Sequence, residues 1–188
     1  MIFERLPVAG AYLVHLEPHA DERGFFARTW CEDEFAAAGI EVRFVQQSLA
    51  KSVSRGTLRG MHLQLAPHEE AKYVRCTSGS IFDAFIDLRP GSPTFLRSAS
   101  VTIDARRGDA VFVPAGCAHG YQTLEDEVEV LYAMSNRYAP HAARSILWSD
   151  PALRIAWPII APIVSRGDAD APTLGAFLER GRVLTALE

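Results

Sequence analysis

The sequence predicts an all-β sandwich or barrel with a few short helices. Six short runs are rich in Val, Ile, Phe and Tyr, the residues that favour strands. Glycine and proline, 13 and 11 of the 188 residues, are spread along the chain and separate these runs. Within several runs apolar residues alternate with polar ones, which is the two-residue period of a strand. The predicted strands are 42–47, 72–76, 80–89, 98–103, 109–114 and 127–135.

The remaining segments add strands and two short helices. Residues 1–24 indicate strands and carry no basic leader followed by an apolar run, so no signal peptide is expected. A helix is expected over 31–39, because three acidic residues occupy its first turn and Gly39 follows its end. A second is expected over 173–181. The Pro-rich stretch 158–172 is expected on the surface, and residues 1–188 as a single domain whose 158–188 segment packs on the barrel.

Alternation also predicts which side chains face inward. In the run 127–135, Val128, Val130, Tyr132 and Met134 share one face, so Tyr132 is expected to point into the barrel. A buried core tyrosine with a satisfied hydroxyl is the alternative for this residue. In the run 80–88, Asp83 and Asp87 share a face and are expected to be structural acids.

Composition limits the partners. Lys and Arg total 19 against 23 for Asp and Glu, a net charge of −4, which argues against a nucleic-acid-binding surface but leaves room for a local cationic pocket. No apolar run approaches the roughly 18 residues of a membrane span. The three cysteines form no CxxC pair, so neither a zinc knuckle nor a redox dithiol is indicated. A cytoplasmic protein with reduced thiols is therefore expected.

A spaced motif lies in the second half of the chain. Gly108, Pro114, Gly116 and His119 fit the pattern GxxxxxPxGxxH, which resembles the second motif of the cupins. In metal-binding cupins the first motif contains HxH, but here Gln64 stands where the second histidine is needed. Amides are poor ligands for transition metals, so no metal is expected. A two-histidine, one-acid set drawn from His62 and the segment 68–70 remains an alternative.

A longer series of motifs carries a more specific resemblance. It consists of Asp21-Glu22-Arg23-Gly24-Phe25-Phe26, Arg59-Gly60-Met61-His62-Leu63-Gln64, Ala71-Lys72-Tyr73-Val74-Arg75, Asp87-Leu88-Arg89-Pro90-Gly91, Pro114-Ala115-Gly116-Cys117-Ala118-His119-Gly120, Leu131-Tyr132, Tyr138 and Trp148-Ser149-Asp150-Pro151. Over residues 1–172 the chain resembles the dTDP-4-dehydrorhamnose 3,5-epimerase family, a metal-free branch of the cupins. The resemblance implies a cupin double-stranded β-helix (jelly-roll barrel), no cofactor, a nucleoside-diphosphate-sugar substrate and a homodimer that exchanges N-terminal strands.

The resemblance also implies roles for individual residues. His62 would be the base that removes a proton next to the sugar ketone, and Tyr132 the acid on the opposite face. Asp168, in Ser165-Arg166-Gly167-Asp168, would hold the second nitrogen of His62. Substrate binding would fall to Arg23, Phe26, Gln47, Arg59, Lys72, His119 and Tyr138, with Lys72 and His119 near the enolate oxygen and the two arginines at the diphosphate.

Four positions depart from the family pattern. Arg28 stands where many family members have a glutamate, and Ala143 falls near another usual acid. The segment 46–50, which contains Leu49, lacks the asparagine that the family has there, and Gly167 replaces a usual lysine. Because these departures fall among residues that contact the nucleotide, the carrier is left open, as is inversion at C3 alone or at C3 and C5. A non-catalytic or a metal-dependent cupin that binds a sugar-type molecule is the alternative function.

Overall fold

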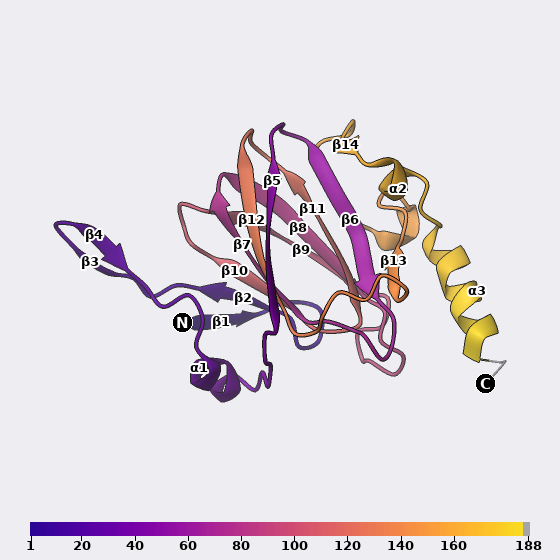
Figure 1. Cartoon of the computed structure of the whole chain (residues 1–188), viewed down its shortest axis with the longest axis horizontal. Helices are drawn as coiled ribbons and strands as arrows, with labels where there is room; N and C mark the ends of the chain where they lie inside the picture. The colour runs from indigo at the N-terminus through magenta and orange to yellow at the C-terminus, as the bar shows by residue number, and fades with distance from the viewer. Residues whose placement is uncertain (186–188) are drawn as a thin grey trace.

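Two antiparallel sheets face each other and form the two walls of a barrel (Figure 1). The structure is a computed structural model that describes residues 1–185, so the last part of the predicted C-terminal segment, residues 186–188, lies outside the described residues. The first sheet has the order β1 (Ile2–Arg5), β2 (Tyr12–His15), β10 (Ala110–Val113), β7 (Lys72–Ser78), β12 (Val128–Met134) and β5 (Gln46–Ser52). The second has the order β13 (Ala143–Ser145), β6 (Thr57–Gln64), β11 (Cys117–Thr123), β8 (Ser80–Asp87) and β9 (Ser98–Asp104), with β14 (Ile163–Val164) parallel to β6.

The main core lies between the sheets. Val74 and Val130 from the first sheet meet Ile81 and Phe85 from the second, and all four are buried. Tyr132 is partly buried and packs against this core, as the alternation in its strand predicts. The cupin-type, all-β fold expected from the sequence is confirmed.

Two smaller clusters cover the outer faces of the sheets. The helix α1 (Glu32–Ala37) buries Phe35 completely against Phe3, Tyr73 and Phe112 of the first sheet. The C-terminal segment contains a 3₁₀ turn (Pro151–Leu153), α2 (Arg166–Ala169) and α3 (Leu174–Thr185). It lies beside the second sheet, where Leu153 and Leu174 are buried in one cluster with strand residues such as Ile86 (Figure 1).

One predicted strand is misplaced. The run 42–47 is extended loop up to residue 45, and β5 covers Gln46–Ser52 instead. The alternating apolar residues Val42 and Phe44 pack into the aromatic cluster around Phe35, with Phe44 stacked on Tyr73 at 6.0 Å, so they serve packing rather than strand pairing. The strand itself is polar because it is an edge strand, paired only with β12.

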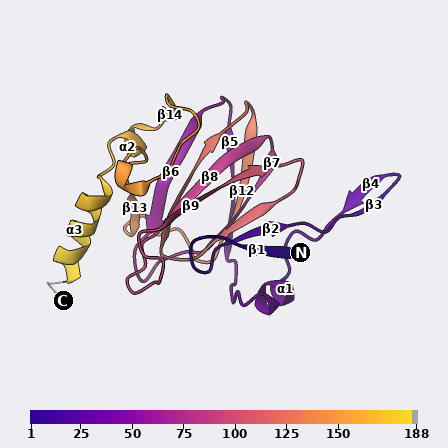
Figure 2. The same cartoon turned by 180° about the vertical axis from the view of Figure 1, so that it is seen from behind.

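A hairpin of β3 (His19–Asp21) and β4 (Gly24–Phe26) extends away from the barrel, at the opposite end of the molecule from α3 (Figures 1 and 2). Phe25 and Phe26 are both largely exposed on it. Its direction means that the hairpin residues do not reach the interior of their own barrel.

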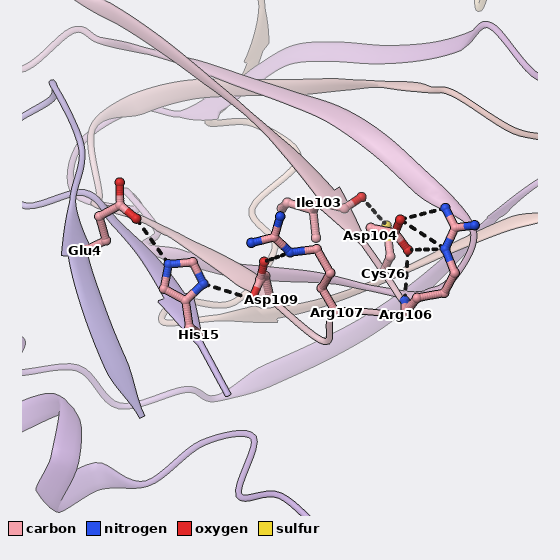
Figure 3. Close-up of polar contacts among 8 residues, drawn as sticks. All are labelled: Glu4, His15, Cys76, Ile103, Asp104, Arg106, Arg107 and Asp109. Carbon is pink, nitrogen blue, oxygen red and sulfur yellow. Dashed lines mark hydrogen bonds and ion pairs between the residues drawn. The ribbon is translucent and has the colours of Figure 1, made fainter. Parts of the chain in front are cut away.

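An ion-pair cluster ties the strands that carry this hairpin (Figure 3). His15 Nδ1 lies 3.0 Å from Asp109 Oδ1 and its Nε2 lies 3.1 Å from Glu4 Oε2, which joins β1, β2 and the start of β10. Arg107 Nε completes the cluster 2.9 Å from Asp109 Oδ2. Burial disfavours the charged imidazole, but the two carboxylates outweigh it and raise the pKa of His15.

All three cysteines are free thiols, and burial raises the pKa of Cys76 and of Cys117 to about 12. In residues 1–185, no helix has both the length and the apolar character needed to cross a membrane.

Candidate active site

The interior of the barrel opens into a large hollow between the two sheets. Two cavities, of about 890 Å³ and about 610 Å³, adjoin there. His62, Lys72 and Tyr132 line both of them, so these three side chains stand where the cavities meet. The sequence-predicted base, acid and lysine are therefore brought together in one place.

Two glycines shape the strand that carries His62. The pairing of β6 with β11 is irregular between His119 and Tyr121, and Gly60 has a φ of +133°. A Cβ atom on Gly60 would lie 2.5 Å from the Cα atom of Gly120, a separation that real structures do not tolerate. The irregular pairing lets Arg59 and His62, three residues apart, both line the smaller cavity.

His62 is held by a carboxylate from the far end of the chain. Its Nε2 lies 2.6 Å from Oδ1 of Asp168, which is only 6% exposed. The Ser165 hydroxyl accepts a hydrogen bond from the Asp168 backbone N–H at 3.1 Å and so fixes the start of α2. Burial works against the charged carboxyl, but the hydrogen bond to His62 prevails and lowers the pKa of Asp168. An ionised Asp168 favours the proton on Nε2, which leaves the lone pair of Nδ1 as the basic site.

Tyr132 reaches the same hollow from the opposite sheet. Its ring packs edge-on against His119, with the two ring centroids 6.3 Å apart. Burial raises the pKa of Tyr132 well above its usual value. The phenol is therefore protonated throughout the physiological pH range and can act as a proton donor.

Two further hydrogen-bonded or ion-paired side-chain pairs line or support the hollow. The ammonium of Lys72 lies 2.8 Å from Glu70 Oε1, and both side chains are largely buried. His119 Nε2 lies 2.7 Å from Asp83 Oδ2, beneath the smaller cavity. Burial raises the pKa of Asp83, with His119 opposing the shift. A cation and an imidazole thus stand beside His62 and Tyr132.

The other predicted binding residues separate into two groups. Arg59 lines the smaller cavity and donates from Nη2 to the Lys51 carbonyl at 3.1 Å, while Tyr138 stands exposed at the larger cavity. Arg23 and Phe26 lie on the projecting hairpin, outside both cavities.

The predicted Gln47 does not line the larger cavity, and its neighbour Gln46 does. Alternate residues of a strand face opposite sides, so the register of β5 against β12 decides which glutamine points inward. The Gln46 side chain accepts a hydrogen bond from the Tyr138 backbone N–H at 3.1 Å. It thereby holds the segment that carries Tyr138.

Sequence reasoning missed Tyr121 and Arg144, which line the hollow, and considered Glu70 only as an alternative metal ligand. The two-residue spacing of Glu70 and Lys72 could have indicated that these side chains pair, because residues two apart on an extended segment lie on one side.

The Gln64 side chain makes its hydrogen bonds to other groups of the protein. Its amide donates to the carbonyls of His68 and Arg137 and to Glu70, and its oxygen accepts from the Ala139 N–H at 2.6 Å. It therefore joins two loops at the rim of the larger cavity. Across the described chain, no three His, Cys, Asp or Glu side chains gather in a way that could hold a metal ion.

Comparisons with known proteins agree on one family. The family model described as dTDP-4-dehydrorhamnose 3,5-epimerase matches residues 5–176. A relative of that name from Shigella flexneri is 42% identical over 149 residues, which cover 79% of this chain and 82% of the relative.

Solved structures give the same result. An epimerase from Legionella pneumophila, crystallised with dTDP-4-keto-L-rhamnose, superposes with a TM-score of 0.87 at 31% identity and 93% coverage of both chains. A 3'-monoepimerase from Streptomyces bikiniensis, crystallised with dTDP-quinovose, gives 0.86 at 37% identity, covering 94% of this chain and 89% of that one.

The fold, the hollow and these comparisons define a cupin-type isomerase that epimerises a sugar nucleotide. Within this class the chain belongs to the dTDP-4-dehydrorhamnose 3,5-epimerase family.

Proposed function

We propose that this chain inverts C3, C5 or both of a nucleoside-diphosphate 4-keto-6-deoxyhexose. The observation that carries the proposal is the placement of His62 with its Asp168 carboxylate on one wall of the hollow and of Tyr132 on the other. The ligands of the Legionella pneumophila and Streptomyces bikiniensis relatives support this substrate class. The two relatives also differ in how many carbons they invert, so the number inverted here is left to experiment.

The reaction begins with the removal of a proton. Hydrogens on C3 and C5 are acidic because both carbons adjoin the C4 ketone. Nδ1 of His62 takes the proton, and the electron pair of the C–H bond moves into the ketone to give an enolate. The Asp168 carboxylate stabilises the imidazolium that forms.

The enolate oxygen needs positive charge or hydrogen-bond donors. Lys72 supplies an ammonium group, which Glu70 positions at 2.8 Å. His119 lies in the same cavity and is held by its hydrogen bond with Asp83. Both side chains are largely buried, so their interaction with a developing charge is weakened little by water.

Reprotonation completes the inversion. Tyr132 gives its phenolic proton to the carbon from the face opposite His62, so the configuration is inverted. Its raised pKa keeps the proton in place until the carbon accepts it. Water then restores both residues to their starting protonation states.

The larger cavity is suited to the nucleotide. It extends from His62 to Tyr138 and Arg144, and a nucleoside needs both an aromatic surface and polar groups. Arg59, at the smaller cavity, is available for the diphosphate.

The proposal includes a homodimer in which the projecting hairpin of one protomer reaches the site of the other. Phe25 and Phe26 on the hairpin are about two thirds and three quarters exposed, and Leu49 is exposed on the edge strand β5. Exposed aromatics and a free strand edge favour association. Arg23 on the hairpin would then bind the diphosphate in the partner's site. Mass measurement by light scattering tests the dimer, and an Arg23→Ala variant with an unchanged KM would argue against that role.

Deuterium exchange tests the reaction. In D₂O, a dTDP-linked 4-keto-6-deoxyglucose incubated with the protein should gain deuterium at C3, C5 or both, with inversion, as followed by NMR. His62→Ala should abolish the exchange while circular dichroism and the unfolding midpoint stay near those of the parent. Exchange by this variant at the parental rate would exclude His62 as the base. No exchange by the parent with any carrier would support the non-catalytic alternative, and exchange that depends on added metal would support the metal-dependent one.

A further inference from the structure

Tyr121 is a second phenol in the hollow that the proposed mechanism does not use. It lies on β11, is 1% exposed, and lines the smaller cavity together with His62, Lys72 and Tyr132. Its hydroxyl is buried and finds no hydrogen-bond partner among the described residues.

An unpartnered buried hydroxyl is costly, because its hydrogen bonds to water are lost and not replaced. A phenylalanine would fill the same space without that cost. The hydroxyl is therefore not explained by packing. Its surroundings are polar as well: Tyr121 pairs across the sheet with Asp83 on β8 and Arg59 on β6, so all three side chains lie on one face. Oδ1 of Asp83 is the other buried side-chain atom without a partner in the described chain.

The phenol of Tyr132 lies close to Tyr121 in the hollow. The two rings lie with their centroids 6.3 Å apart and their planes inclined by 48°. The pKa of Tyr132 is raised first by burial and then by the neighbouring Tyr121, which acts both through charge, because two adjacent phenolates would repel each other, and through the approach of the two hydroxyl groups. Only one of the two phenols can therefore ionise at a time, and the other keeps its O–H group.

We propose that Tyr121 is a positioning residue whose hydroxyl donates a hydrogen bond to the Tyr132 phenolate formed during reprotonation. This inference rests on the proposed function. When the carbon takes the proton, the O–H bond of Tyr132 breaks and a C–H bond forms. The negative charge of the enolate thereby moves to the Tyr132 oxygen, and the Tyr121 O–H group stabilises it until water returns a proton.

The expected size follows from hydrogen-bond strength. A hydrogen bond to a charged acceptor is roughly twice as strong as one between neutral groups, so it favours the phenolate over the phenol. Losing it should slow reprotonation by about tenfold. Proton removal by His62 should change little, because that step precedes formation of the phenolate.

Tyr121→Phe tests the inference. The kcat for inversion should fall about tenfold with KM unchanged. In D₂O the variant should still exchange the sugar hydrogen through His62, so the ratio of exchange to inversion should rise. The unfolding midpoint in urea should stay equal to the parent's or increase, because the removed hydroxyl has no partner.

Tyr73→Phe is the matched control. Tyr73 is also a buried tyrosine, but its hydroxyl donates to the Thr29 carbonyl at 2.9 Å, outside both cavities. This variant should lose stability and keep the parental kcat.

An unchanged kcat and exchange ratio in Tyr121→Phe, with an active parent, would overturn the inference and leave the proposed function intact. A loss of kcat that is matched by a raised KM or a lowered unfolding midpoint would also overturn it, because it would indicate a structural role. An inactive parent would instead contradict the proposed function.

Discussion

Replacing Asp168 with Asn should slow proton abstraction without disturbing the barrel. Asn has the same shape but no negative charge, so it removes the charge-assisted hydrogen bond to His62. That bond is short, at 2.6 Å, and its carboxylate is nearly buried. A hydrogen bond to a charged group contributes about 1.5–3 kcal/mol, and each 1.36 kcal/mol corresponds to a factor of ten, so kcat should fall about 10- to 150-fold.

Two measurements are needed. The rate of deuterium incorporation at C3 and C5 in D₂O reports proton abstraction, since the His62 base carries out that step. KM should change little, because Asp168 stabilises the imidazolium formed during reaction more than it stabilises bound substrate. A urea titration should show that the variant is folded under the assay conditions.

Asp109→Asn is the control for the loss of a histidine-bound carboxylate. Asp109 also lies against a histidine, at 3.0 Å from His15, but in the outer cluster of Figure 3. This variant should lose stability and keep the parental kcat. If Asp168→Asn exchanges deuterium as fast as the parent, or if Asp109→Asn loses as much kcat, the assignment of Asp168 as the partner of the base is wrong.

Three other variants test the chemistry and the fold. Tyr132→Phe should reduce inversion at least 100-fold, a typical loss for a general acid, while exchange by the base persists; equal losses of both would argue against an acid on the opposite face. Gly120→Ala should lower the free energy of unfolding by about 1–3 kcal/mol, since a Cβ there would lie 2.8 Å from the Arg59 carbonyl oxygen, whereas Gly175→Ala, with open space around it, should not. The stabilisation from protonated His15 is complete below the unfolded value of 6.5 and is lost as the pH rises through the higher folded pKa. Urea midpoints should therefore fall more steeply from pH 6 to 9 in the parent than in His15→Gln, and parallel curves would contradict this ion pair.

Alternation predicted much of the fold and part of the site. The inward direction of Tyr132 followed from the apolar residues two and four positions before it, and the structure places it in the hollow. The predicted strand at 80–88 forms, with Phe85 in the main core and Ile86 on the other face in the outer cluster. The two acids of this strand have different partners. Asp87 is bound by Arg89, whereas Asp83 supports His119 beneath the cavity.

The rest depended on contacts between distant segments. The strands β6 and β11 contain Gly and His and lack Val and Ile, so propensity did not predict them; they form because neighbouring strands supply hydrogen-bond partners. The choice between Gln46 and Gln47 required the register of β5 against β12, which the local pattern does not contain. The unpartnered hydroxyl of Tyr121 has no sequence signal, because it depends on which groups surround it in three dimensions.

The long separation between His62 and Asp168, 106 residues along the chain, has a consequence for biosynthesis. All strands through β13 have been synthesised by residue 145, before the carboxylate of Asp168 is added to the chain. A polypeptide clipped shortly before Ser165 would keep the strands through β13 and yet lack Asp168, the carboxylate that we propose supports the His62 base.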